Sequence, residues 1–225
     1  YDRLIDHRNG DYQNALLNAM NLCIEEQDTQ TLETLITDNS DYLQEACSIY
    51  GKYVSNKGAT ALFVGLLAAG GTAADWTELV QKIDDAAILA LINTGLNPVE
   101  ILAEYEQRIN MKELAAYTTY EKLTEESKKI AMERIQKKNS QNFAELKDNF
   151  SEQVILTTIE KNLGYETIDE CLHQNQELLG IDFTVCDKLN NPDKVYQALA
   201  GKTLQTLAEV KTAFDNAVAQ QKKTE

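Results

Sequence analysis

Residues 65–72 come closer to a catalytic or ligand-binding motif than any other stretch of this chain. They read Gly-Leu-Leu-Ala-Ala-Gly-Gly-Thr. A phosphate-binding loop has the pattern G-x-x-x-x-G-K-[ST] after a β-strand, and its lysine contacts the phosphates. Here Gly71 stands at the lysine position, and the residues before Gly65 read as a buried helix. We therefore expect a closely packed helix of small residues that ends in a glycine turn.

His173 is the second feature that could do chemistry. Asp169 lies four residues before it and Glu177 four residues after it, so on a helix both carboxylates share its face. Such a set could bind a metal ion, and an enzyme site built around His173 is one hypothesis. Because the chain has 36 acidic residues, this spacing arises easily by chance, and we favour an exposed histidine in a salt bridge.

The cysteines do not form a recognisable redox, metal or nucleophile motif. None lies in a C-x-x-C pair, and each has apolar neighbours: Cys23, Cys47, Cys171 and Cys186. We expect reduced core residues and a reducing, cytoplasmic compartment. Cys171 and His173 are two residues apart, so on a helix their side chains diverge. With no other catalytic pattern present, we expect no catalytic residue, no cofactor and no metal, and a chain that is not an enzyme.

Composition limits the partners. The formal net charge is −15 over 225 residues, which disfavours nucleic acid and anionic membranes. The longest largely apolar run, residues 59–69, is too short to span a bilayer, so we expect no membrane insertion. With two prolines, ten glycines and many helix-forming residues, the sequence favours an all-α fold.

Helix signals recur every 10 to 20 residues. Asn97-Pro98-Val99-Glu100 is the clearest start, and that helix is expected to reach about Ile109. Thr72 with Asp75 resembles a capping box ahead of Trp76, and Asp84 or Asp85 is expected to open a further helix. Other expected helices cover residues 12–27, 59–69, 125–138, 141–150, 152–163, 168–179, 193–200 and 202–221. Residues 181–186 are the likeliest strand, and the run is short.

Residues 125–138 differ from the rest of the chain. They carry five cations and few apolar residues: Lys128, Lys129, Arg134, Lys137 and Lys138. Two glutamates lie four residues before a cation, in the order that favours an ion pair on a helix: Glu125 before Lys129, and Glu133 before Lys137. We favour a solvated helix, and a binding patch for an acidic ligand is the alternative.

We therefore expect about twelve short helices stacked as helical hairpins, in an irregular α-helical repeat or multi-helix domain. The apolar density falls near residues 123–140. That fall divides the chain into a tyrosine-rich repeat-like region (1–123), an exposed charged helix (124–140) and a C-terminal helical region (141–225). One continuous domain is the alternative.

Two stretches resemble diverged ankyrin repeats. Leu91-Ile92-Asn93-Thr94-Gly95-Leu96-Asn97-Pro98 is similar to the end of an ankyrin second helix and its turn, and Leu35 to Asp41 is a poorer copy. The resemblance covers about residues 14–98. It lacks the Thr-Pro-Leu-His opening, and the copies start 56 residues apart where the family repeats at about 33. The resemblance implies a protein-binding scaffold without an activity of its own.

Tyrosine is the unusual residue type, with ten copies against five Phe and one Trp. Eight lie in the first 120 residues. We favour the interpretation that these tyrosines line the edges of small helix–helix contacts. The alternative is a recognition surface, since tyrosine is enriched in interfaces. The candidate partner-binding residues are Tyr50, Tyr53, Tyr117 and Tyr120.

The sequence thus predicts a non-catalytic protein–protein interaction domain whose partner is another protein. The Lys-, Asn-, Gln- and Glu-rich composition suits a bacterial effector or secretion-system protein, which could be delivered to a host cell. The alternative is a helical accessory or regulatory domain of a larger enzyme.

Overall fold

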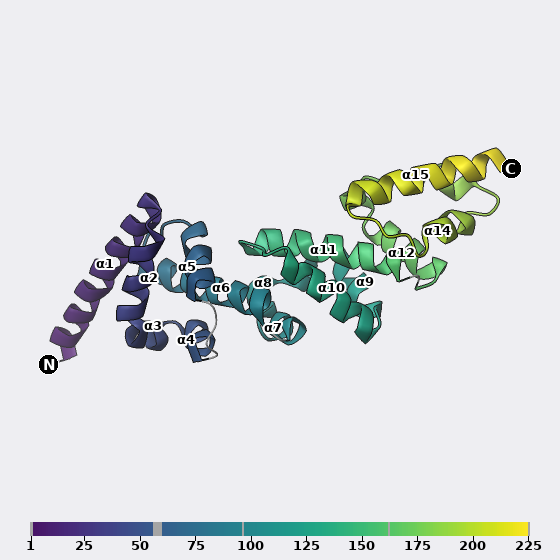
Figure 1. Cartoon of the computed structure of the whole chain (residues 1–225). Helices are drawn as coiled ribbons and strands as arrows, with labels where there is room; N and C mark the ends of the chain where they lie inside the picture. Colours follow the sequence, from purple (N-terminus) through teal and green to yellow (C-terminus); the bar gives the residue numbers. More distant parts are fainter. Residues whose placement is uncertain (1, 56–59, 96, 162, 225) are drawn as a thin grey trace. The chain divides into compact units, whose positions relative to one another are not determined.

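The computed structural model describes residues 2–55, 60–95, 97–161 and 163–224 (Figure 1). Over these residues the chain forms fifteen α-helices, two short 3-10 helices and no strand. The all-α prediction is therefore confirmed. Residues 181–186 form no strand; they include a turn and the first residue of the 3-10 helix η2 (Cys186–Lys188). The sequence Asn56-Lys57-Gly58, which predicts a helix end, lies outside the described residues.

The chain divides into two compact units. Unit 1 comprises residues 1–105 and 139–145, and unit 2 comprises residues 106–138 and 146–225. These units do not coincide with the three regions expected from the sequence. Residues 106–123, expected with the first region, belong to unit 2, as does nearly all of the expected charged helix.

Unit 1 is built around a central helix, α6 (Trp76–Thr94), which packs against α1, α4, α5 and α7. Asp75 caps its first turn: the Asp75 carboxylate accepts from the Glu78 N–H (2.8 Å), and the Glu78 carboxylate accepts from the Ala74 N–H (2.7 Å). The cap therefore joins Asp75 with Glu78, not Thr72 with Asp75 as the sequence predicted. The other helices of unit 1 are α1 (Asp2–Glu26), α2 (Thr29–Asp38), α3 (Ser40–Ala46), α4 (Ser48–Ser55), α5 (Thr60–Ala69) and α7 (Pro98–Glu104).

Packing explains why α6 is one helix where two were expected. Its apolar residues repeat at helical spacing across the Asp84-Asp85 pair, and Ile83 and Ala87 on either side are fully buried. One continuous helix buries these apolar side chains together, and this burial stabilises the fold more than a new N-cap at an aspartate would. Asp84 caps a different helix: its carboxylate accepts from the N–H groups of Ile49 and Tyr50 at the start of α4 (3.1 and 3.0 Å).

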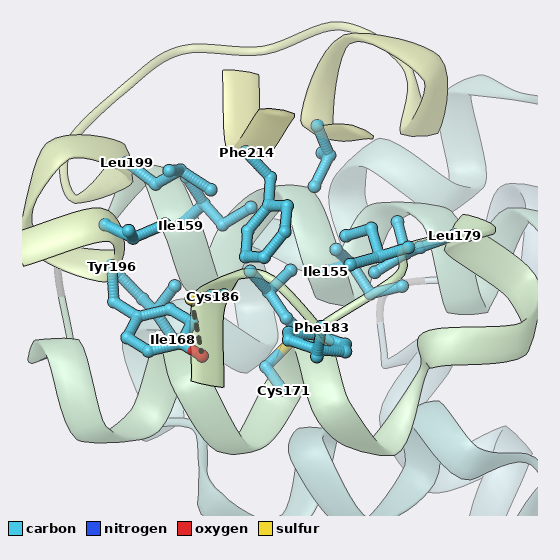
Figure 2. Packing of buried hydrophobic residues seen from close by; sticks show 14 of the residues in the cluster. Ile155, Ile159, Ile168, Cys171, Leu179, Phe183, Cys186, Tyr196, Leu199 and Phe214 are labelled. Atoms are coloured by element: carbon cyan, nitrogen blue, oxygen red, sulfur yellow. Dashed lines mark hydrogen bonds between the residues drawn. The ribbon is translucent and has the colours of Figure 1, made fainter. Parts of the chain in front are cut away.

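Unit 2 has its own hydrophobic core, which Figure 2 shows. Ile155 and Ile159 of α11, Ile168 of α12 and Phe214 of α15 meet there, and all four are fully or almost fully buried. The helices of unit 2 are α8 (Glu106–Ile109), η1 (Met111–Glu113), α9 (Ala115–Lys122), α10 (Glu125–Lys137), α11 (Phe143–Glu160, whose first three residues belong to unit 1), α12 (Tyr165–Gln174), α13 (Gln176–Leu179), α14 (Asp193–Leu199) and α15 (Leu207–Thr224).

Several expected boundaries shift. The helix at Pro98 begins as predicted but ends at Glu104, and the short helix α8 follows it. Residues 143–160 form one helix where two were expected. The charged helix α10 starts after Thr124 as expected, but it is only half exposed. It buries Ser127, Ala131, Met132 and Ile135 along one face.

None of the helices in the described ranges combines the length and the apolar character needed to cross a bilayer.

Candidate protein-binding surface

Two of the tyrosines proposed for partner binding lie in the core of unit 1. Tyr50 and Tyr53 are each 3% exposed, and both rings pack on Phe63, with centroids 5.1 and 5.5 Å away. Burial raises the pKa of both hydroxyl groups. The expectation that these side chains are exposed is not met, because α4 packs against α6 and both tyrosine rings lie against Phe63 of α5. They match the favoured interpretation of tyrosines in helix contacts.

The other two candidates lie in unit 2. Tyr120 is 8% exposed and packs on Phe150 with a centroid distance of 5.1 Å, and burial raises its pKa to about 12. Tyr117 is half-buried beside the same two rings. The structure thus brings the four candidates together in two pairs, one in each unit, and three of the four are buried.

A different set of aromatic side chains forms a partly exposed cluster on unit 1. Tyr12 of α1 and Tyr42 of α3 meet edge to face with ring centroids 4.7 Å apart, and Trp76 of α6 lies 5.8 Å from Tyr42. Tyr12 is 40% exposed, and Tyr42 and Trp76 are half-buried. We call these three residues the aromatic cluster. It joins three helices that are far apart in the sequence.

Polar contacts hold the two tyrosines of the aromatic cluster. The Gln13 side-chain amide donates to the Tyr42 hydroxyl (3.0 Å), and the Tyr12 hydroxyl donates to the Asn39 side-chain oxygen. Asn39 in turn donates to the Leu35 carbonyl (2.7 Å), so its orientation is fixed by α2. These bonds restrict the rotation of the two tyrosine rings.

A second device positions Trp76. The Asn21 side chain on α1 donates to the Ala73 carbonyl (2.8 Å) and accepts from the Ala73 N–H (2.9 Å). This two-bond contact, which we call the Asn21 clasp, ties α1 to the segment that leads into α6. The Lys82 ammonium also donates to the Gly70 carbonyl (2.6 Å). The residues that resembled a phosphate loop form the end of α5 and a glycine turn, as expected, but Gly65 and Ala69 are exposed, so the small residues are not closely packed.

The aromatic cluster lies in an acidic setting. Each of its members directly follows an exposed aspartate: Asp11, Asp41 and Asp75. No other tyrosine or tryptophan in the chain directly follows an aspartate. Unit 1 contains seventeen acidic and five basic residues, a formal net charge of −12, so it carries most of the charge of −15. The aspartate–aromatic pairs are the sequence signal that could have pointed to this surface.

His173 pairs as expected with one of its two candidate carboxylates. Its Nδ1 lies 2.6 Å from Asp169, and its ring stacks on Phe183 with a centroid distance of 3.8 Å. The second ring nitrogen lies 3.9 Å from Asp187, not beside Glu177. Across the described residues, no three His, Cys, Asp or Glu side chains are grouped so that they could hold a metal ion. The side chain of His7 lies outside the described part of the chain.

The four cysteines are buried free thiols, as the sequence predicts. Burial raises the pKa of Cys171 to about 12, so this thiol stays protonated at neutral pH. Cys186 lies 3.8 Å from the Tyr196 hydroxyl in the core of unit 2, the contact drawn dashed in Figure 2. A buried, protonated thiol is a poor nucleophile and a poor metal ligand.

No protein-family model, curated protein or solved structure matches this chain. The resemblance to ankyrin repeats therefore stays a prediction.

Proposed function

We propose that the chain is a non-catalytic protein-interaction domain, and that the aromatic cluster binds a basic segment of a partner protein. The observation that carries the proposal is the convergence of Tyr12, Tyr42 and Trp76 on one partly exposed surface, each beside an exposed aspartate. Tyrosine and tryptophan dominate binding energy in interfaces. Their ring faces also attract Lys and Arg side chains, and aspartates at the rim strengthen that attraction.

The rigidity of the surface supports the same proposal. The Asn21 clasp and the Gln13 and Asn39 hydrogen bonds hold the rings before a partner arrives. A preorganised surface loses less side-chain entropy on binding, so more of the contact energy appears as affinity.

The wider setting of the interaction stays a prediction from composition. A bacterial effector, which could act inside a host cell, and a helical accessory domain of a larger enzyme would both use such a surface. The parent reading frame discriminates between them, because catalytic motifs beyond either end would favour the accessory domain.

The proposal is tested by affinity capture with three versions of the 225-residue chain as bait. The first is wild type. The second carries Tyr12→Ala and Tyr42→Ala, which removes two rings of the aromatic cluster. The third carries Tyr105→Ala, a matched control that removes a half-buried tyrosine of unit 1 away from the cluster. Circular dichroism is used to check that all three baits are folded.

We expect one protein, retained in stoichiometric amount by wild type and Tyr105→Ala, to be lost from the double variant and eluted by salt. Salt elution is expected because the rim attraction is electrostatic and screened. Equal retention by all three baits would exclude the aromatic cluster as the binding surface. No retained protein at low salt would contradict the interaction function itself.

A further inference from the structure

A basic pocket of about 340 Å³ lies within unit 2, remote in sequence from the aromatic cluster. One wall is the last turn of α10, with Arg134 and Lys137, together with Lys138 directly after the helix. The second wall is α11, with Gln153 and Glu160. The segment between α14 and α15 closes the third side. We call this site the basic pocket.

The walls of the basic pocket are fixed by hydrogen bonds of their own. The Gly201 N–H donates to the Ile159 carbonyl (2.8 Å), which ties the third wall to α11. Gly201 has φ = +79°, a backbone conformation that favours glycine. The Gln205 N–H donates to the Glu209 carboxylate (2.7 Å) at the start of α15. These bonds hold the third wall of the pocket against α11 and the start of α15.

Positive charge exceeds negative charge around the basic pocket. Arg134 pairs with Glu160 at 2.7 Å, and Lys161 also lies 3.4 Å from Glu160. Burial alone would raise the pKa of Glu160, but hydrogen bonds from Arg134 and Lys161 outweigh burial and lower it, so this carboxylate stays ionised. Lys138 pairs with Glu152 at 3.0 Å.

Lys137 is the cation left over. Its side chain is exposed, lines the basic pocket and makes no hydrogen bond or ion pair with any residue in the described ranges, so the helix pair expected with Glu133 is not formed. Among the residues that line the pocket, three cations (Arg134, Lys137 and Lys138) thus stand against one carboxylate (Glu160), an excess of two positive charges in a chain whose net charge is −15. A lysine in the last turn of α10 interacts favourably with the helix dipole, which is reason enough for a lysine at this position. The helix dipole does not account for a pocket beside it.

We propose that the basic pocket binds the phosphate group of a small phosphorylated molecule. A phosphate monoester is close to a dianion at neutral pH, which matches the local excess of charge. Its three terminal oxygens can accept from donors on separate walls, here Lys137 and the side chain of Gln205. The volume suits a compact ligand, since it lies at the lower end of the range for small-molecule sites.

The test is a binding titration of the full chain by nuclear magnetic resonance, with glycerol 3-phosphate as the probe and chloride at matched ionic strength as the reference. The variant is Lys137→Ala. The matched control is Lys129→Ala, an exposed lysine on the same helix that does not line the basic pocket. Both sites are exposed, so both variants should fold. Lys137→Glu supplies a charge reversal at the same position.

We expect saturable shifts with the phosphate monoester, at least about fivefold weaker for Lys137→Ala, unchanged for Lys129→Ala and absent for Lys137→Glu. Equal shifts with chloride would reduce the effect to ionic screening and overturn the proposal. Equal affinity of wild type and Lys137→Ala would place the phosphate elsewhere. Tighter binding of a phosphoserine peptide than of the monoester would overturn the small-molecule assignment. None of these outcomes depends on the aromatic cluster.

Discussion

At the scale of single residues, the buried carboxylate of Asp84 shows how one side chain joins two helices. It is 5% exposed and lies in the middle of α6, yet it satisfies the first N–H groups of α4. Free N–H groups at a helix start need such a partner. The cap comes from 34 and 35 residues away along the chain. Asp84 therefore fixes α4, and with it Tyr50 and Tyr53, against the centre of unit 1.

We predict that Asp84→Ala lowers the free energy of unfolding by about 1–3 kcal/mol, because it leaves two N–H donors in a buried site without their acceptor. Urea unfolding measured by circular dichroism checks this. Glu45→Ala, at an exposed position on α3, is the control and should change the free energy by less than about 0.5 kcal/mol. An Asp84→Ala variant as stable as the control would mean that the cap contributes nothing.

Tyr120 leads to a prediction about alkaline pH. Burial raises its pKa to about 12 from 10.0, so the folded chain keeps the proton at pH values where the unfolded chain releases it. The associated stability is complete below pH 10 and is lost as pH rises towards 12. We expect the unfolding free energy of wild type to fall more steeply over this range than that of Tyr120→Phe. Parallel curves for the two proteins would contradict the raised pKa.

The residue scale also shows what the sequence can and cannot reveal about a surface. In the sequence, Leu43, Cys47, Tyr50 and Tyr53 follow one another at spacings of three and four residues, so the burial of the two tyrosines could be predicted from spacing, although the chain breaks at Cys47 into α3 and α4. The aspartates before Tyr12, Tyr42 and Trp76 were visible too. That three such pairs converge on one surface could not be predicted, because it depends on how α1, α3 and α6 pack.

At the scale of elements, the sequence predicts that the segments are helical, but it often does not predict where each helix ends. Pro98 and Thr124 mark helix starts correctly, because proline and N-cap residues act locally. The sequence also predicts a helix start at Asp84 and a break between the helices 141–150 and 152–163, but both positions lie inside continuous helices. Buried residues lie on both sides of each position, so tertiary packing stabilises an unbroken helix. This packing outweighs the local preference of an aspartate or serine for a helix start.

The Asn21 clasp provides the prediction for this scale. Asn21→Ala removes both bonds between α1 and Ala73, so the segment before α6 should loosen and Trp76 should become more accessible. We expect acrylamide to quench the fluorescence of this variant more strongly than that of wild type. Asn18→Ala, at an exposed position one turn earlier on α1, is the control. Identical quenching in both variants would show that the clasp does not hold Trp76.

At the scale of the whole molecule, charge is divided unequally between two units that each have a core. Unit 1 carries −12 and unit 2 carries −3, from nineteen acidic and sixteen basic residues. Like charges in a compact unit repel one another and reduce its stability at low ionic strength. The single tryptophan lies in unit 1, so its fluorescence reports on that unit, whereas circular dichroism reports on both.

We predict that added salt raises the thermal midpoint detected by Trp76 fluorescence more than the midpoint detected by circular dichroism. The reason is that screening at about 0.1 M salt, where the Debye length is about 10 Å, relieves more repulsion in unit 1. Thermal scans at low and moderate sodium chloride check this. A larger rise in the circular dichroism midpoint would contradict the account.

The most direct test of the central claim is the affinity of the captured partner for three proteins: wild type, the Tyr12→Ala and Tyr42→Ala double variant, and Tyr105→Ala. Trp76 lies in the aromatic cluster, so its fluorescence can follow each titration. We predict that the double variant binds at least about thirtyfold more weakly, as expected for the loss of about 2 kcal/mol from an aromatic anchor. Tyr105→Ala should bind like wild type. Equal affinity for all three proteins would contradict the proposal that the aromatic cluster is the binding surface.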